Sequence, residues 1–119
     1  MNATELQERL IDFSAMIINM TEKLPKSQAG KNLAGQLVRS STSVTLNYGE
    51  ACGSESQKDF VHKLRLVLKE LRETFAGLKL INKINLLNDT QIFDKALKEN
   101  SELIAIFVSS IKTASLKLK

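Results

Sequence analysis

Apolar residues recur at alternating three- and four-residue intervals through four long stretches of the chain, which is the period of an amphipathic helix. In the first stretch the repeat is a strict heptad, made of Leu6, Leu10, Phe13, Ile17, Met20 and Leu24. In the third stretch the same repeat is made of Phe60, Leu64, Val67, Leu71, Thr74, Leu78 and Ile81. The sequence therefore predicts an all-α fold, an antiparallel up-down-up-down four-helix bundle.

Capping and turn residues divide the chain into four helices, predicted over about 3–24, 28–53, 55–86 and 90–118. Asn2 or Thr4 can cap the first helix, and Pro25 prevents the residue before it from staying helical. Ser27 can cap the second helix, and Ser54 or Ser56 the third. With 119 residues and 43% hydrophobic content, the chain is predicted to form one domain, 1–119, with its own core.

The apolar faces are wider than a single seam. The fourth helix is predicted to bury Phe93, Leu97, Ile104, Phe107, Ile111, Ala114 and Leu118, with Asn100 interrupting the row. A second apolar row flanks the main one on three helices and consists of Ile11, Ile18, Val61, Leu68, Phe75 and Leu103. This second row is either additional core or the contact surface of a closed ring of identical subunits, and both interpretations stay open.

Targeting and redox features indicate the compartment. Residues 1–10 carry Glu5 and Glu8 among their apolar positions, which is unlike a secretory signal. No apolar run approaches the length that spans a bilayer, so we expect a cytoplasmic protein without membrane contact. Cys52 is the single cysteine, and we expect it to be a buried, inert thiol in a reducing compartment.

Hydroxyl residues crowd the centre of the second helix, where strong helix formers would be expected. They are Ser40, Ser41, Thr42, Ser43 and Thr45. Together they should cost about 2 kcal/mol in helix propensity. Small side chains allow close helix packing, and their hydroxyls can bond to the preceding turn. We favour that interpretation over an anion site, because helix-interior hydroxyls lack the free backbone amides of a phosphate cradle.

Two polar strips face each other across the second and third helices. Antiparallel pairing about a turn near residue 54 places Arg39 opposite Glu70 and Glu73. The same register brings Asn47, Glu50 and His62 together as a predicted network. The strips either fix the register of the two helices or line a polar pocket, and we favour register.

The chain lacks the residues that the common catalytic sites of helical bundles need. His62 is the single histidine and no glutamate stands three residues before it, so a di-iron site is not expected. Cys52 and His62 have no glycine-rich oxyanion loop beside them. Gly30, Gly35 and Gly49 follow no predicted strand and make no phosphate-binding loop. We therefore expect no enzyme activity, no metal and no cofactor.

Positive charge gathers on the third helix and at the end of the chain. The net charge is +4, and the third helix carries Lys58, Lys63, Arg65, Lys69, Arg72, Lys79 and Lys83. A solvated helix face explains this pattern for a monomer. A ring of five subunits would carry about +20 and could attract nucleic acid through its phosphates. The candidate contact residues are Lys79, Lys83, Lys117 and Lys119.

Several segments of the chain together make a specific signature. They are the runs at 23–27, 37–44, 47–51, 59–64 and 69–74, and their most distinctive residues are Arg39, Ser41, Asn47, Tyr48, Glu50, Asp59, Phe60, Glu70 and Glu73. In these runs the chain resembles a bacterial family of four-helix bundles named for open reading frames in the intervening sequences of 23S rRNA genes. The family defines no catalytic residue, and the resemblance implies that the signature positions are structural.

The resemblance also implies an assembly and a class of partner. Members of the family look like homopentamers, so a homopentameric ring is expected here. A related protein, the accessory variability determinant of diversity-generating retroelements, is a basic pentameric barrel that binds a reverse transcriptase and nucleic acid. We therefore expect a non-enzymatic, oligomeric binding or scaffold protein whose partners are structured RNA or DNA, or a nucleic-acid-processing protein. The alternative is a protein-interaction module without direct nucleic-acid contact.

Overall fold

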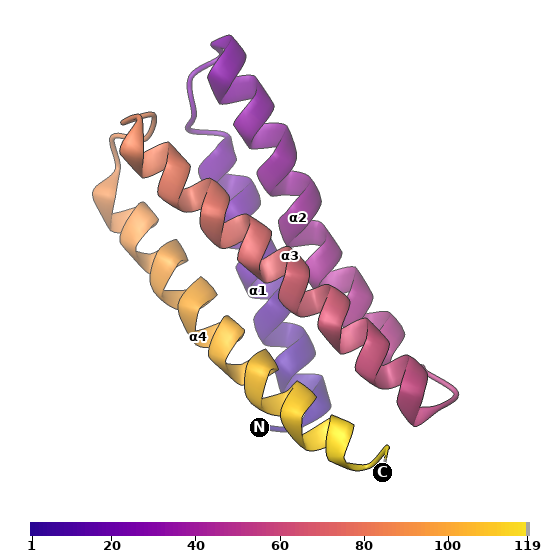
Figure 1. The fold of residues 1–119 in the computed structure, drawn as a ribbon. Coiled ribbons are helices and arrows are strands. Elements are labelled where there is room, and N and C mark those ends of the chain that lie inside the picture. Colours follow the sequence, from indigo (N-terminus) through magenta and orange to yellow (C-terminus); the bar gives the residue numbers. More distant parts are fainter. Residues whose placement is uncertain (119) are drawn as a thin grey trace.

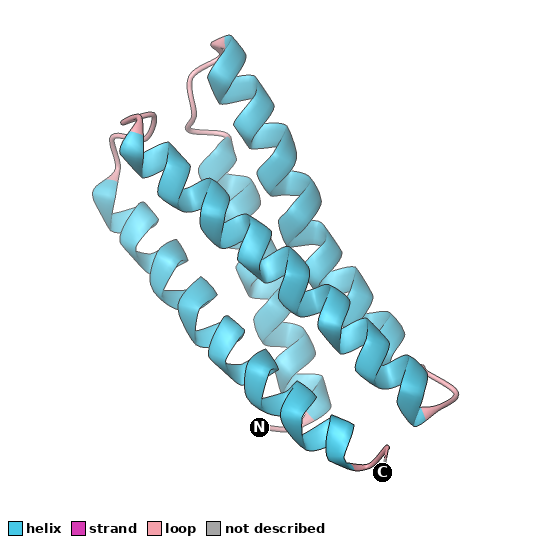
Figure 2. Cartoon of the chain, in the orientation of Figure 1, coloured by secondary structure: helices cyan, strands magenta, loops and turns pink. Residues whose placement is uncertain are grey.

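Four antiparallel helices form a rod in a computed structural model, which describes residues 1–118. They are α1 (Ala3–Thr21), α2 (Gln28–Cys52), α3 (Gln57–Lys83) and α4 (Thr90–Leu116). The rod measures 48 × 22 × 22 Å, and the start of α1 and the end of α4 lie at the same end of it (Figure 1). Within the described residues the chain consists of helices and the loops that join them (Figure 2). The predicted all-α bundle is confirmed.

Side-chain caps set where the helices begin. Asn2 caps α1 in a capping box, in which its Oδ1 accepts from the Glu5 amide at 2.8 Å and the Glu5 carboxylate accepts from the Asn2 amide at 3.1 Å. The other three helices are capped by the side chains of Ser27, Ser56 and Asp89. Because Ser56 rather than Ser54 is the cap, α3 begins two residues later than predicted.

The first helix ends before the residue that the sequence predicted. α1 ends at Thr21 rather than at 24. The chain tightens into three-residue turns ahead of Pro25, with the Leu24 amide donating to the Thr21 carbonyl at 3.1 Å. The prediction placed the end at Leu24, directly before the proline, but the helix ends about one turn earlier.

The other three helices also end slightly early. α3 ends at Lys83 rather than at 86, since Asn85 adopts a left-handed φ of 55°. α4 ends at Leu116 rather than at 118, and α2 ends at Cys52, one residue short of the predicted end. Such differences of one to three residues leave the topology unchanged.

The heptad seams of α1 and α3 form the core, with one exception. Every predicted seam residue of α1 is buried, and on α3 the same holds from Leu64 to Ile81. At the start of α3, Val61 is buried and Phe60 is half-buried, so the seam begins one position later than predicted. Val61 thus belongs to the core, which was one of the two interpretations of the flanking row.

The buried stripe of α4 differs from the predicted one. Ala96 and Leu103 are fully buried, whereas Leu97 and Ile104 are half-buried and Leu118 is exposed. For Leu103 and Ile104 the reason is that residues 103–108 are apolar throughout, so that periodicity alone could not choose which row faces inward.

The remaining residues of the flanking row divide by position. Leu68 and Phe75 of α3 and Ile18 of α1 are half-buried, while Ile11 is exposed. Most of the row is therefore covered, at least in part, within a single chain. None of the four helices in residues 1–118 combines the length and the apolar character needed to span a bilayer.

Candidate functional site

The hydroxyl residues of α2 bond to both neighbouring helices. Thr45 Oγ1 donates to the Leu10 carbonyl of α1 at 2.9 Å, and Ser14 Oγ of α1 donates to the Ser41 carbonyl at 2.7 Å. On the other side, the hydroxyls of Ser40 and Thr74 lie 2.7 Å apart. The run thus holds α1, α2 and α3 together through small polar groups, which fits the close-packing interpretation.

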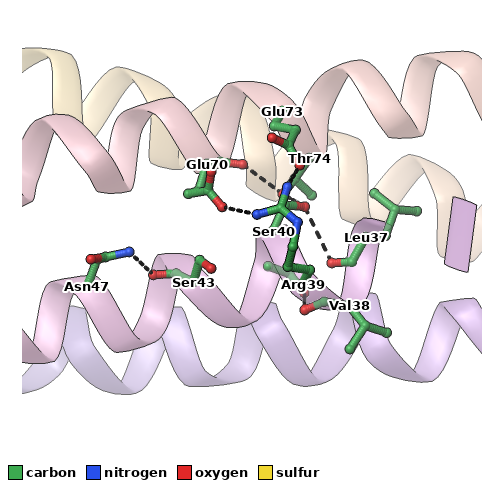
Figure 3. A network of polar contacts seen from close by, with 10 residues as sticks. Leu37, Val38, Arg39, Ser40, Ser43, Asn47, Glu70, Glu73 and Thr74 are labelled. Carbon is green, nitrogen blue, oxygen red and sulfur yellow. Dashed lines mark hydrogen bonds and ion pairs between the residues drawn. The ribbon is translucent and has the colours of Figure 1, made fainter. Parts of the chain in front are cut away.

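Arg39 reaches from α2 to two carboxylates of α3 (Figure 3). Its Nη1 donates to Glu70 Oε2 at 2.9 Å, and its Nη2 pairs with Glu73. The Arg39 side chain is 50% exposed, whereas that of Glu70 is only 9% exposed. The predicted pairing is present, and the buried partner is the carboxylate rather than the arginine.

We expect Arg39→Ala to lower the free energy of unfolding by about 1 to 2 kcal/mol. The substitution removes the charged partner of a nearly buried carboxylate, but Arg39 itself is half in solvent, so the loss falls below that of a fully buried pair. Urea denaturation of Arg39→Ala, Glu70→Gln and the double variant forms a cycle that isolates the pair. A single-variant loss near zero would show that Glu70 is solvated without its partner.

The predicted network of Asn47, Glu50 and His62 is wrong. Asn47 Nδ2 donates to the Ser43 carbonyl of its own helix at 2.9 Å (Figure 3), and His62 is exposed. Glu50 instead accepts from Lys63 Nζ at 2.6 Å.

The register of α2 against α3 explains this error. Ser40 meets Thr74 and Glu50 meets Lys63, so the residue of α3 opposite a given residue of α2 lies about one and a half helical turns further along than predicted. The prediction assumed a symmetric turn centred at residue 54. In the structure the connection runs over residues 53–56, and the two helices are displaced along their axes.

Asn100 is the one polar side chain of α4 that is fully buried within the described residues. With its amide oriented to satisfy both neighbours, its nitrogen donates to the Leu71 carbonyl at 3.0 Å and its oxygen accepts from the Phe75 amide at 3.1 Å. The sequence showed that Asn100 interrupts an apolar row but indicated no partner. The structure identifies the partner as the backbone of α3.

The signature residues do not converge on a single site. Arg39, Glu70 and Glu73 form one cluster at the middle of the α2–α3 seam. Tyr48 and Phe60 instead lie near the end of the bundle where α2 turns into α3. A structural role fits the first cluster, since ion pairs between helices fix their register.

The four candidate lysines do not form one patch in a single chain. Lys79 and Lys83 are exposed near the end of α3, whereas Lys117 follows α4 at the opposite end of the rod (Figure 1). Lys119 lies outside the described residues.

A longer basic surface follows α3 instead. Its members, here called the α3 cationic stripe, share one exposed helix face and are Lys58, Arg65, Lys69, Arg72, Lys79 and Lys83. None of the six forms an ion pair within residues 1–118, whereas Lys63 is paired with Glu50. The stripe extends about 38 Å along the helix at 1.5 Å per residue. The charges were visible in the sequence, but which of them lack partners was not.

Comparison with known proteins identifies the family. The model of the 23S rRNA-intervening sequence protein family matches residues 3–109. The chain belongs to this family. No curated protein matches it.

A solved structure supports the fold of this 23S rRNA-intervening sequence protein. It is the crystal structure of a protein with unknown function from the S23 ribosomal protein family of Bacteroides thetaiotaomicron VPI-5482. That protein is 28% identical, the match covers 94% of this chain and 99% of that chain, and the TM-score is 0.84.

Neither a metal centre nor a buried thiol is found in the part of this family member that the structure describes. No cluster of three or more histidine, cysteine, aspartate or glutamate side chains lies close enough to hold a metal ion in residues 1–118. Cys52 is exposed, so the expectation of a buried thiol is wrong. α2 ends at Cys52, and the last turn of a helix at the tip of a bundle has fewer neighbours to cover it.

Proposed function

We propose that this 23S rRNA-intervening sequence protein is a non-enzymatic, oligomeric binding protein that contacts the phosphates of structured RNA through the α3 cationic stripe. The observation that carries the proposal is the row of six exposed cations that lack ion-pair partners in residues 1–118. Unpaired lysine and arginine side chains bind phosphate and release counterions, which is the main source of affinity for nucleic acids.

Two further features support phosphate contact over base recognition. The aromatic side chains are few, and most of them, such as Phe13, Tyr48 and Phe107, are buried, so they offer no platform for base stacking. Double-stranded RNA is recognised mainly through its shape and its backbone, which phosphate contacts along one helix face can supply. The family name adds a link to 23S rRNA, which makes RNA a more specific expectation than DNA.

The proposal includes a homopentameric ring, because one stripe of six charges is a modest electrostatic surface. A ring would present five stripes and raise the local potential accordingly. Support for self-association comes from apolar side chains left in solvent, since Leu46 is 60% and Leu116 64% exposed. The same residues favour the second candidate, a protein-interaction module, with a nucleic-acid-processing protein as its partner.

RNA binding should depend on the stripe rather than on total charge. We expect Lys69→Gln, Arg72→Gln and Lys79→Gln combined to weaken binding to an RNA hairpin by about tenfold or more at low salt. The slope of log affinity against log salt should fall by about 3, one for each lost phosphate contact. Fluorescence titration at several salt concentrations measures both quantities. Light scattering on the same sample should give about five times 13.3 kDa.

The matched control removes three exposed lysines elsewhere, by Lys23→Gln, Lys26→Gln and Lys31→Gln. This control changes the net charge by the same amount as the stripe variant and should retain most of the affinity for the RNA hairpin. Equal losses of RNA affinity in both triple variants would show that binding depends on total charge and not on the stripe. Equal affinity of the wild type for heparin would show the same. Absence of binding tighter than about 10 µM would favour the protein-interaction module. A light-scattering mass equal to that of one chain would contradict the homopentameric ring.

A further inference from the structure

The end of the bundle where α2 turns into α3 is hollowed beside the first turn of α1. One pocket, of about 490 Å³, lies between α2, the following turn and Phe60 of α3. A second, of about 290 Å³, lies between the first turns of α1 and Gly49 of α2. Ala3 and Cys52 contribute to both walls, so the two pockets adjoin.

The hollow follows from the lengths of the helices. Arg9 of α1 pairs with Glu99 and Glu102 of the antiparallel α4, so the start of α1 lies roughly level with residues 105–108. α4 continues to Leu116 and packs there on α3, with Gln57 Nε2 donating to the Ala114 carbonyl at 3.0 Å. Gly49 of α2 lies beside Gln7 of α1, so α2 ends at Cys52 roughly level with the start of α1. Beyond that level α3 and α4 continue, and the space beside them is covered only by the turn after α2.

Two polar groups in these walls lack strong partners. The Tyr48 side chain is only 5% exposed, with its ring edge on Phe107 at 5.6 Å between centroids, and its hydroxyl faces the Cys52 thiol, a weak partner. Gln7 Nε2 donates to the Thr45 carbonyl at 3.3 Å, but its Oε1 is buried without a partner in the described residues. Gln7 also lines the second pocket, so a ligand donor there would lie beside this unsatisfied acceptor.

The charge of the walls selects against anions. Glu8 and Glu55 contribute to them, and among the described residues no lysine or arginine does. Burial, with the Cys52 thiol adding to it, raises the pKa of Tyr48 to about 12, so the phenol stays protonated and can donate at neutral pH. The hollow is thus opposite in character to the α3 cationic stripe.

We propose that this end pocket binds a small aromatic molecule that carries N–H donors and no negative charge. Its ring would lie against Phe60 and Tyr48, and its donors would reach Gln7 Oε1 and the Glu55 carboxylate. The site is independent of RNA binding, because none of the stripe residues lines it.

Benzamidine, benzamide and benzoate test the charge and donor requirements, since they share one shape and differ in charge. Molecules of this size bind with dissociation constants on the order of millimolar. Cys52 is exposed and is the single cysteine, so its alkylation by iodoacetamide, followed by mass spectrometry, reports occupancy. We expect about 10 mM benzamidine or benzamide to slow alkylation about threefold or more, and benzoate to have no effect.

Variants separate binding from folding. Gln7→Leu removes the unpaired acceptor and should abolish protection, with retained helicity checked by circular dichroism. Gly49→Ala adds a methyl group to the second pocket, 3.9 Å from Gln7 Oε1 and without a clash, and should reduce protection in a folded protein. Gly35→Ala, with nothing within 4 Å of the new methyl, is the matched control and should keep it. Equal protection by benzoate, no protection by any of the three compounds, or full protection in Gln7→Leu would overturn the proposal.

Discussion

Asn100→Asp should lower the free energy of unfolding by about 4 kcal/mol at pH 7 and by much less at pH 4. The side chain is fully buried and bonds to the Leu71 carbonyl and the Phe75 amide. A protonated carboxyl can reproduce both bonds, whereas a carboxylate would face a carbonyl without water. Burial therefore raises the pKa of the new carboxyl in the folded state well above its ordinary value.

The sign of the pH effect follows from that shift. Below about pH 4 the carboxyl is protonated in both the folded and the unfolded state, so the variant keeps its stability. As the pH rises from there toward the raised folded pKa, the free energy of unfolding of the variant falls progressively. Urea denaturation of variant and wild type at each pH measures the difference. Ser101→Asp, on the exposed next residue, should show no such difference. Equal losses for Asn100→Asp at both pH values would mean that water reaches the site.

Gly30→Ala should lower the free energy of unfolding by about 2 to 3 kcal/mol, although alanine is the better helix former. Gly30 lies in the first turn of α2, and a methyl group there would overlap the Pro25 carbonyl oxygen. That atom belongs to the backbone, so relief requires the turn between α1 and α2 to move.

A second glycine of α2 provides the control of opposite sign. Gly35→Ala meets nothing within 4 Å. It should therefore raise the free energy of unfolding by about 0.5 to 1 kcal/mol. Thermal or urea unfolding of the two variants compares them directly. A Gly30→Ala protein as stable as Gly35→Ala would show that the turn adapts without loss.

The parts of the fold that could be predicted well are those fixed by local periodicity. The heptads of α1 and α3 repeat over several turns, so the row that turns inward could be predicted, except at the start of α3, where Phe60 and Val61 are both apolar. The uniformly apolar stretch 103–108 allowed several faces, and the choice depended on where α1 and α3 lie against α4. Caps were predictable because Asn2 and Ser27 act within a few residues of themselves.

Pairing across helices could be predicted only in part. Arg39 meets Glu70 despite the error in register, because a long arginine side chain tolerates displacement along the seam. Asn47 and His62 are shorter, so the same displacement separates them. The same limit applies to the candidate site. The sequence does not distinguish Lys63 from the other basic residues of α3, and only the structure shows that Glu50 neutralises it.

The seam between α1 and α4 should be the last part of the bundle to assemble. Every other contacting pair of helices is adjacent in sequence, whereas Arg9 and Glu99 are separated by 90 residues. Closing so long a loop is entropically unfavourable, and the helical hairpins on either side can form without it. We therefore expect the α1–α4 seam to form last in folding. In native-state hydrogen exchange we expect it to open first, with α1 separating from α4 while α3 and α4 stay packed together.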